Sequence, residues 1–238
     1  MSNFLLEKFI DLLSSEPRGK VLDIGCGDGD YALALHQLGF DVLAADMDEA
    51  RFKYKDKIKF QKCNVAEKLP FKDGSFKYIV LAEVVEHLKN PYEVMGELKR
   101  ILKPGGKLIL STPNILNLKS RMRYLVEGCW EYFREPLIEN SKNPRMVIWN
   151  LHVIPWRYHE LEYLLYHSGL AIETIATSRH RGLGLCFLIP LIKLQLYLKA
   201  RRARSKGNVD YMRINKILSS KDMLFGEHLV IKAVKKMV

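Results

Sequence analysis

The sequence predicts an α/β fold in which helices flank a doubly wound, mostly parallel sheet of seven strands. Short apolar runs alternate with helix-like segments over residues 20–111, and this spacing is typical of βαβ units with right-handed crossovers. The chain has 238 residues, of which 48% are hydrophobic and 27% charged. That composition fits a globular chain and excludes a disordered or collagen-like one, so we expect a single domain over residues 1–238.

The first half of the chain supplies five predicted strands. They are short apolar runs at residues 20–24, 41–45, 58–63, 78–82 and 107–111. The helix before the fifth strand has clear sequence boundaries. Asn90 is placed to cap it and Pro91 to be its first residue, while Pro104, with two glycines after it, should end it.

The regular pattern returns later in the chain, after an interruption. A helix is expected at 155–167, and strands at 170–176 and 227–234. Two insertions separate these elements: residues 115–150 are rich in aromatic and basic side chains, and residues 179–226 are first apolar and then basic. The expected core of the domain therefore consists of residues 1–114, 151–178 and 227–238.

The net charge of +11 is concentrated at the end of the chain. Residues 1–178 hold 24 Lys and Arg against 24 Asp and Glu, whereas residues 179–238 hold 14 against 3. So local an excess indicates an anionic partner of this segment.

The remaining composition indicates a reduced, cytoplasmic protein. The four cysteines (Cys26, Cys63, Cys129 and Cys186) are far apart and form no CxxC pair, so neither a zinc site nor a disulfide framework is expected. No acidic cluster has metal-binding spacing, so no metal is required. Residues 1–13 mix charged with apolar side chains, which favours an amphipathic helix over a signal peptide.

The most informative stretch is VLDIGCGDG at residues 21–29, an apolar strand followed by glycines at every second position. Glycine permits a tight turn and a close approach of the backbone to a ligand. A dinucleotide fingerprint would need a third glycine at position 30, which is Asp30. The pattern instead favours a cationic or zwitterionic ligand, whose amino or sulfonium group Asp23 and Asp28 could face.

Asp46 ends the second predicted strand, 21 residues after Gly25. A carboxylate at this position can accept hydrogen bonds from both hydroxyls of a ribose. Its alternative role is to cap a helix, but Asp48 is better placed for that. We therefore predict that Asp46 binds a nucleoside.

Four motifs within residues 19–114 resemble those of class I S-adenosylmethionine-dependent methyltransferases. In order, they are VLDIGCGDGD, AADMD, LPFKDGSFKYIVLAEVVEHL and LKPGGKLILSTPN. EVVEHL, STPN and the later HVIPWRYHELEYLLYHSGL are most similar to ubiquinone-type O-methyltransferases and to small-molecule methyltransferases of cell-envelope pathways. Lys77 departs from the family, which usually has Asp there. The resemblance implies a Rossmann-like fold with an antiparallel last strand, S-adenosylmethionine as cofactor, and methyl transfer.

The resemblance also implies which residues bind the cofactor. They follow predicted strands one to four: Gly25, Cys26 and Gly27 at its methionine part, Asp46 at the ribose, Met47, Asn64 and Val65 at the adenine, and Ala82 and Glu83 closing the pocket. Asn64 stands where the family often has Asp, and its amide could still accept from the adenine amino group, although more weakly than a carboxylate.

Two histidines are candidates for a catalytic base. Displacement at a sulfonium methyl group depends largely on positioning and desolvation, but a hydroxyl acceptor also needs a base. His87 follows Glu86 just beyond the fourth strand, and His152 ends the aromatic insertion. Either could instead make only a structural hydrogen bond. Four further histidines are expected to lie outside the pocket: His159, His167, His180 and His228.

The second insertion contains an apolar run, residues 183–198, followed by KARRARSK. A 16-residue helix spans about 24 Å, short of a ~30 Å hydrocarbon core, so a spanning helix is not expected. Pro190 should start the helix. Three alternatives remain: a helix packed on the sheet or over the active site, an element on an anionic membrane surface through residues 179–206, and an RNA-binding segment, for which aromatic side chains are scarce.

The sequence thus predicts a methyltransferase of a small or lipid-linked acceptor, preferably at oxygen, with both insertions forming or covering the acceptor site. We expect it in the cytoplasm, and association with the inner face of the membrane is one of the alternatives for residues 179–206. The alternatives are an RNA methyltransferase that binds through residues 179–226 and a non-catalytic cofactor-binding protein.

Overall fold

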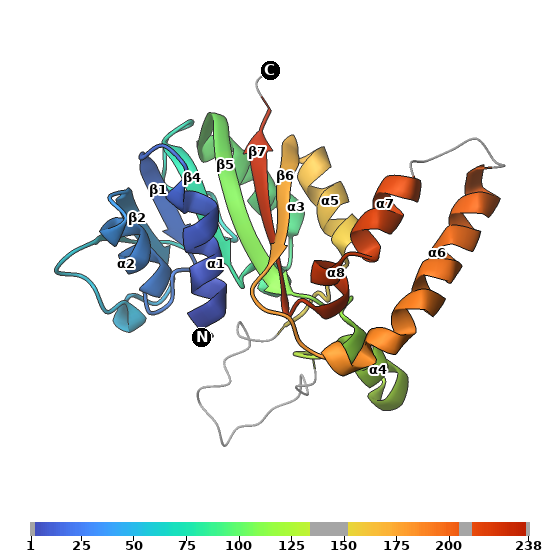
Figure 1. The fold of residues 1–238 in the computed structure, drawn as a ribbon. Coiled ribbons are helices and arrows are strands. Elements are labelled where there is room, and N and C mark those ends of the chain that lie inside the picture. Colours follow the sequence, from blue (N-terminus) through green and yellow to red (C-terminus); the bar gives the residue numbers. More distant parts are fainter. Residues whose placement is uncertain (1–2, 134–151, 205–210, 237–238) are drawn as a thin grey trace.

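The protein is built on one seven-stranded sheet with the strand order β3-β2-β1-β4-β5-β7-β6 (Figure 1). The computed structural model describes residues 3–133, 152–204 and 211–236. The strands are β1 (Lys20–Ile24), β2 (Asp41–Asp46), β3 (Lys59–Lys62), β4 (Phe76–Ala82), β5 (Leu102–Pro113), β6 (Leu170–Thr177) and β7 (His228–Lys235). Only β7 runs against its neighbours, β5 and β6. The predicted fold class, with its antiparallel last strand, is confirmed.

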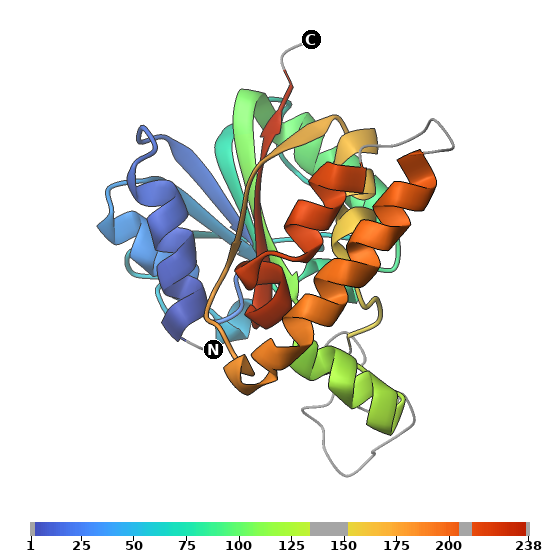
Figure 2. The same cartoon turned by 45° about the vertical axis from the view of Figure 1, so that its right-hand side comes forward.

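Helices cover both faces of this sheet (Figures 1 and 2). They are α1 (Asn3–Ser14), α2 (Asp30–Gln37), α3 (Pro91–Ile101), α4 (Leu118–Glu127), α5 (Tyr158–His167), α6 (Ile189–Arg204), α7 (Tyr211–Leu218) and α8 (Lys221–Phe225). Three short 3₁₀ turns matter for the site and the second insertion: η1 (Glu49–Arg51), η2 (Val85–His87) and η4 (Leu183–Leu188).

Alternate residues of β4 divide between two hydrophobic cores. Tyr78 and Val80 pack with residues of α1 and α2, whereas Ile79 and Leu81 pack with residues of α3 and α5. Burial on both faces explains why the central strands are continuous apolar runs. The carboxyl ends of the parallel strands meet at one edge of the sheet, from which the loops with the predicted site residues emerge.

Two predicted element boundaries were wrong. β5 begins at Leu102, directly after α3, so Pro104, Gly105 and Gly106 lie within the strand instead of forming a turn before it. A register shift against β4 between Phe76 and Tyr78 accommodates these extra residues. α5 begins at Tyr158, three residues later than predicted, because the preceding chain packs against η2 instead of continuing the helix.

The described parts of the two insertions are mainly helical. α4 lies in the first insertion, where no helix was predicted, and the rest of that insertion, residues 134–150, is outside the described residues. In the second insertion, α6 and α7 lie side by side (Figure 2), and the Asn215 side-chain amide donates to the backbone oxygen of Leu196 (2.8 Å). Pro190 is the second residue of α6, so the predicted helix start is confirmed.

Candidate active site

The glycine loop after β1, residues 25–29, has left-handed backbone at Gly25 (φ +74°) and Gly27 (φ +52°). A Cβ on Gly25 would lie 2.5 Å from a methyl carbon of Val84, which is too close for any real contact. A Cβ on Gly27 would meet only the Arg51 guanidinium, at 3.4 Å. Gly25 is therefore required by the packing against Val84, whereas Gly27 keeps its surroundings open to a ligand.

Asp46, at the end of β2, fixes this loop. Its Oδ2 accepts from the backbone N–H of Gly27 (2.9 Å), and its Oδ1 accepts from that of Asp48 (3.0 Å). Asp48 caps η1 by accepting from the N–H of Ala50 (3.1 Å), so the assignment of capping to Asp48 and not to Asp46 is confirmed. Each Asp46 oxygen retains lone-pair capacity for a ligand, so the ribose contact stays a prediction.

Asp23 is buried inside β1, beneath the loop, and its Oδ2 has no hydrogen-bond partner among the described residues. Burial raises the pKa of this carboxyl to about 7. A hydrogen bond from the Ala32 backbone favours the ionised form and opposes this rise only in part. Cys26 is also buried, and burial raises the pKa of its thiol. Asp23 thus has one carboxyl oxygen, Oδ2, without a partner among the described residues.

The suggestion that Asp28 faces a cationic ligand group was wrong. Its carboxylate binds Lys53 Nζ (2.7 Å) and Arg51 Nη2 (3.3 Å), both on the segment after β2. Hydrogen bonding to Lys53 is the main cause that holds the Asp28 pKa below its usual value. Asp28 therefore attaches the loop to that segment.

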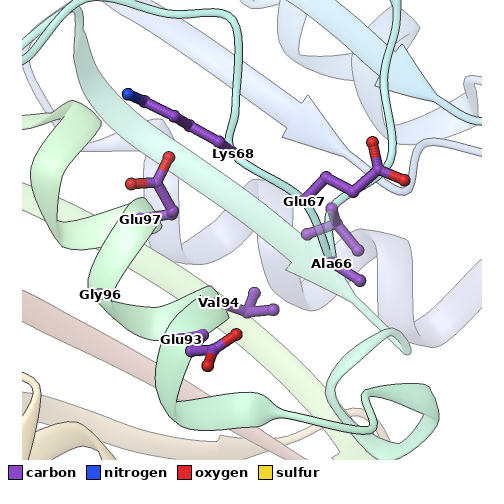
Figure 3. Close-up of a pocket in the computed structure, with 8 residues that line it drawn as sticks. Ala66, Glu67, Lys68, Glu93, Val94, Gly96 and Glu97 are labelled. Atoms are coloured by element: carbon purple, nitrogen blue, oxygen red, sulfur yellow. The ribbon is translucent and has the colours of Figure 1, made fainter.

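Three predicted adenine contacts lie on the neighbouring strand ends. Met47 is exposed, as a residue beside an open ligand site would be. The Asn64 side chain accepts from the N–H of Ala66 (3.0 Å) and donates to Glu67 (2.9 Å), so it stabilises its own turn. Val65 lines a depression of about 530 Å³ against α3, to which no residue of the glycine loop contributes. Figure 3 shows the carboxylates around it, among them Glu93 and Glu97.

A second group of polar side chains begins where β4 ends, at Ala82. Glu83 has a backbone φ of +54°. Residues other than glycine rarely adopt this conformation, and those that do are frequently found at functional sites. Ser111 of β5 donates its hydroxyl to Glu83 Oε1 (2.7 Å). Burial raises the pKa of Glu83 to about 7 in spite of this hydrogen bond.

His228, at the start of β7, was expected to have no place in the pocket, and the structure places it beside Glu83, one of the predicted pocket residues. Its Nε2 lies 3.7 Å from Glu83 Oε2, and its Nδ1 lies 2.7 Å from the Ser178 hydroxyl. The antiparallel register explains the position, because His228 pairs with Pro113 at the end of β5. Burial lowers the pKa of this imidazole, which favours its neutral form.

The two predicted catalytic histidines lie next to each other. The ring centroids of His87 and His152 are 4.8 Å apart, and His152 Nε2 is 3.9 Å from an oxygen of the buried Glu86. The chain after His152 is held against η2, because the N–H groups of Val153 and Ile154 both donate to the Glu86 backbone oxygen (2.9 and 3.0 Å). The proximity of His87 and His152 therefore depends on tertiary contacts. The catalytic role of these two histidines stays a prediction.

Glu86, His87 and His152 also form a group that could hold a metal ion. Each offers one ligand atom, and these atoms lie within 4.8 Å of one another. Neither Glu86 carboxyl oxygen has a hydrogen-bond partner among the described residues. Burial, followed by the neighbouring Glu83, raises the Glu86 pKa well above its usual value. The sequence spacing did not indicate this group because His152 is far from His87 along the chain.

The sequence also gave no reason to choose Glu227, a buried acid next to His228. Tyr132 donates its hydroxyl to Glu227, and the guanidinium groups of Arg179 and Arg181 pair with it. These contacts fasten the start of the second insertion to the edge of the sheet that carries Glu83. The one available signal was an acid at the first position of the last predicted strand.

Comparison with known proteins identifies the family of this chain. Residues 2–173 match the family model described as the methyltransferase domain. The mitochondrial ubiquinone biosynthesis O-methyltransferase of Rattus norvegicus is 27% identical over 168 residues, which cover 66% of this chain and 46% of that protein. The Roseobacter denitrificans protein of the same function is 33% identical over 140 residues, 51% of this chain and 56% of that protein. The chain thus spans about half the length of the curated relatives it matches.

Solved structures share the fold over almost the whole chain. A SAM-dependent methyltransferase from Archaeoglobus fulgidus has a TM-score of 0.61 at 19% identity, covering 97% of this chain and 91% of that one. A putative methyltransferase from Bacillus halodurans has a TM-score of 0.60 at 17% identity, covering 98% and 99%. At such identities the similarity establishes the arrangement of the sheet and helices.

Proposed function

The chain belongs to the S-adenosylmethionine-dependent methyltransferases, and from this premise we propose that it methylates a hydroxyl oxygen of a small or lipid-linked acceptor. The observation that carries the proposal is the pair His87 and His152 beside Glu86, just beyond the end of β4. A hydroxyl acceptor must lose a proton during the transfer, and a neutral imidazole is suited to take it. Relatives whose names specify O-methylation support the same choice.

The residues of the glycine loop fit the cofactor. The unpartnered Oδ2 of Asp23 lies beneath the loop, and a Cβ on Gly27 would have only Arg51 near it. We assign the methionine part to Gly25, Cys26 and Gly27 and the ribose to Asp46. Met47, Asn64 and Val65 would contact the adenine, with Ala82 and Glu83 closing the pocket. When bound, the cofactor supplies a methyl group activated by its positively charged sulfur.

The hydrogen bonding of His152 determines which of its ring nitrogens can act as a base. Its Nδ1 lies within hydrogen-bond distance of the backbone oxygen of Tyr132. A carbonyl oxygen can only accept, so Nδ1 carries the proton and Nε2 of the neutral ring has a free lone pair. This Nε2 is the atom that lies toward Glu86, at 3.9 Å from its Oε1.

The proposal is tested by turnover with hydroxylated aromatic acceptors, with and without a prenyl tail, measured as release of S-adenosylhomocysteine. We expect His152→Gln or His87→Gln to lower turnover at least about 100-fold, the usual scale of a lost general base. Affinity for S-adenosylhomocysteine, measured by calorimetry, should stay unchanged. His159→Gln, on an exposed position of α5, is the matched control.

Two results would contradict the proposal at different levels. Methylation of amines but not of hydroxyl groups would reject O-methylation while leaving the cofactor site intact. Failure to bind S-adenosylmethionine or S-adenosylhomocysteine, with Asp46→Ala having no effect, would reject the assignment of the cofactor residues.

A further inference from the structure

α6 is apolar on two sides, and only one of them is packed against the protein. Ile189 and Ile192 pack with Leu224 and Phe225 of α8 in a small hydrophobic cluster, and Ala200 is buried. These α6 positions are spaced by three and eight residues, so they lie on one side of the helix, which we call the inner stripe. The inner stripe accounts for how α6 attaches to the domain.

The opposite side of α6 is exposed. Leu191, Leu194 and Leu198 of α6 are 57%, 53% and 40% exposed, and Phe187, in η4 directly before α6, is 68% exposed. From Phe187 they follow one another at intervals of four, three and four residues, so they form a second line of large apolar side chains, the outer stripe. Packing within the described part of the chain does not account for the outer stripe, and contiguous exposed apolar surface of this kind marks an interaction site.

The charge around the outer stripe has one sign. The segment Leu183–Arg204 contains no Asp or Glu. Its exposed cations are Lys193, Lys199, Arg201 and Arg202. In helical projection, Arg201 follows Leu194 by seven residues and therefore continues the outer stripe beyond its apolar part. The surface thus combines an apolar line with a cationic end, the pattern of a helix that lies on an anionic bilayer.

Among the described residues, Leu183–Arg202 is long and apolar enough, by length and composition alone, to cross a membrane. The inner stripe argues against a span, because Ile189 and Ile192 pack on α8 and the backbone oxygen of Leu196 accepts from Asn215 of α7. A helix bound along one side to a folded domain can still place its other side in the interface between head groups and acyl chains.

We propose that the outer stripe of α6 docks the protein on an anionic phospholipid surface. Phe187, Leu191 and Leu194 enter the boundary of the acyl chains, while Lys199 and Arg201 contact phosphate head groups. The insertion starts at Arg179 and Arg181, which pair with Glu227 at the edge of the sheet that carries Glu83. Docking through α6 therefore also positions the active site relative to the membrane. The proposal holds whatever acceptor is methylated.

The test is sedimentation with vesicles of phosphatidylglycerol and phosphatidylcholine in equal parts, compared with phosphatidylcholine alone. We expect the protein to sediment with the anionic vesicles, and less so as salt is added. Leu191→Gln with Leu194→Gln should weaken this binding at least about tenfold, because two apolar contacts are lost. Lys199→Gln with Arg201→Gln should reduce binding and its salt dependence.

The matched control is Tyr92→Gln with Tyr163→Gln, which removes two exposed aromatic side chains from α3 and α5. It should bind vesicles like the unaltered protein. All variants should keep their melting temperature and their affinity for S-adenosylhomocysteine, so a loss of vesicle binding is separable from a failure of folding or of the proposed function.

Four results would overturn the proposal. The protein could stay in the supernatant with anionic vesicles, or the leucine variant could bind them as well as the unaltered chain. A dimer seen by light scattering, dissociated by the leucine substitutions and without vesicle binding, would identify a second copy as the occupant of the stripe. Retention on single-stranded RNA without vesicle binding would assign the cations to nucleic acid.

Discussion

The two halves of the candidate site are built in different ways. The cofactor half, from Asp23 to Asp46, consists of strand ends and a glycine loop, which the Asp46 carboxylate holds by accepting from backbone N–H groups. The half that we assign to the acceptor places His152 beside Glu86 and His228 beside Glu83, and the members of each pair are far apart in the chain. The first half is specified by local sequence, and the second by how distant elements pack. Substitutions should therefore affect the two halves through different properties.

The largest effect is expected at Gly25. Gly25→Ala places a Cβ on a left-handed backbone and too close to Val84, so the backbone or Val84 must shift. The substitution should therefore lower the free energy of unfolding by about 4 kcal/mol. Gly27→Ala has only the backbone strain, since nothing but Arg51 lies near, and should cost about 1 kcal/mol. Urea unfolding measures both.

Calorimetry with S-adenosylhomocysteine completes this comparison. Gly27→Ala should weaken binding more than its small loss of stability implies, because its Cβ occupies the space we assign to the ligand. If Gly27→Ala binds like the unaltered protein, the assignment of the methionine part to this loop is wrong.

The next effect concerns pH and Asp23. Its pKa is 3.8 in the absence of perturbation and about 7 in the folded protein. A raised folded-state pKa means that the group's contribution to stability is complete below about pH 4 and is lost as the pH rises through 7. At 1.36 kcal/mol per pKa unit this amounts to at most about 4 kcal/mol. Asp23→Asn, which does not titrate, should therefore gain stability relative to the unaltered protein between about pH 4 and pH 7.

Asp28→Asn is the control with the opposite sign. The Asp28 pKa is lowered by Lys53 and Arg51, so its contribution is present at neutral pH and lost as the pH falls through the folded-state pKa. The side chain is exposed, so the change should stay below about 1 kcal/mol. Thermal unfolding of the ligand-free protein across this pH range measures both variants. A parallel pH dependence for Asp23→Asn and the unaltered protein would contradict the buried neutral carboxyl.

The same contrast explains what the sequence could predict. Strand ends and the glycine loop were predictable because the spacing of Gly25 and Asp46 is a local property of a βαβ unit. His87 and His152 could each be chosen for their chemistry, but their contact depends on how the chain after His152 packs against η2.

The errors have physical causes of the same kind. Asp28 was misassigned because its cationic partners, Arg51 and Lys53, come from another loop. The proximity of His228 to Glu83 was not predicted, because it follows from the register of β7 on β5, which periodicity does not reveal.

Asn114 lets the acceptor half be destabilised separately. Its side-chain amide donates to the backbone oxygens of Gly226 (3.0 Å) and Met223 (3.1 Å), and its oxygen accepts from the N–H of Leu116 (3.0 Å). Asn114→Ala leaves these buried groups unpaired and should cost about 2–3 kcal/mol. Hydrogen exchange should increase in α8 and β7 while affinity for S-adenosylhomocysteine is kept.

The matched control for this prediction is Asn64→Ala, in a partly exposed turn of the cofactor half. It should cost less than about 1 kcal/mol and weaken cofactor binding instead. An equal loss of cofactor affinity in both variants would show that the two halves do not respond separately.

The smallest effect is expected at His228, which we consider a positioning residue. It is linked to Ser178 (2.7 Å) and approaches Glu83 (3.7 Å), so its loss should shift Glu83 without removing a base. One hydrogen bond of this kind is worth about 1–1.5 kcal/mol, so His228→Gln should lower kcat about tenfold and leave the KM for the cofactor unchanged. If His228→Gln instead lowered kcat as much as is expected for His152→Gln, His228 would be the base. The acceptor site would then lie at the start of β7.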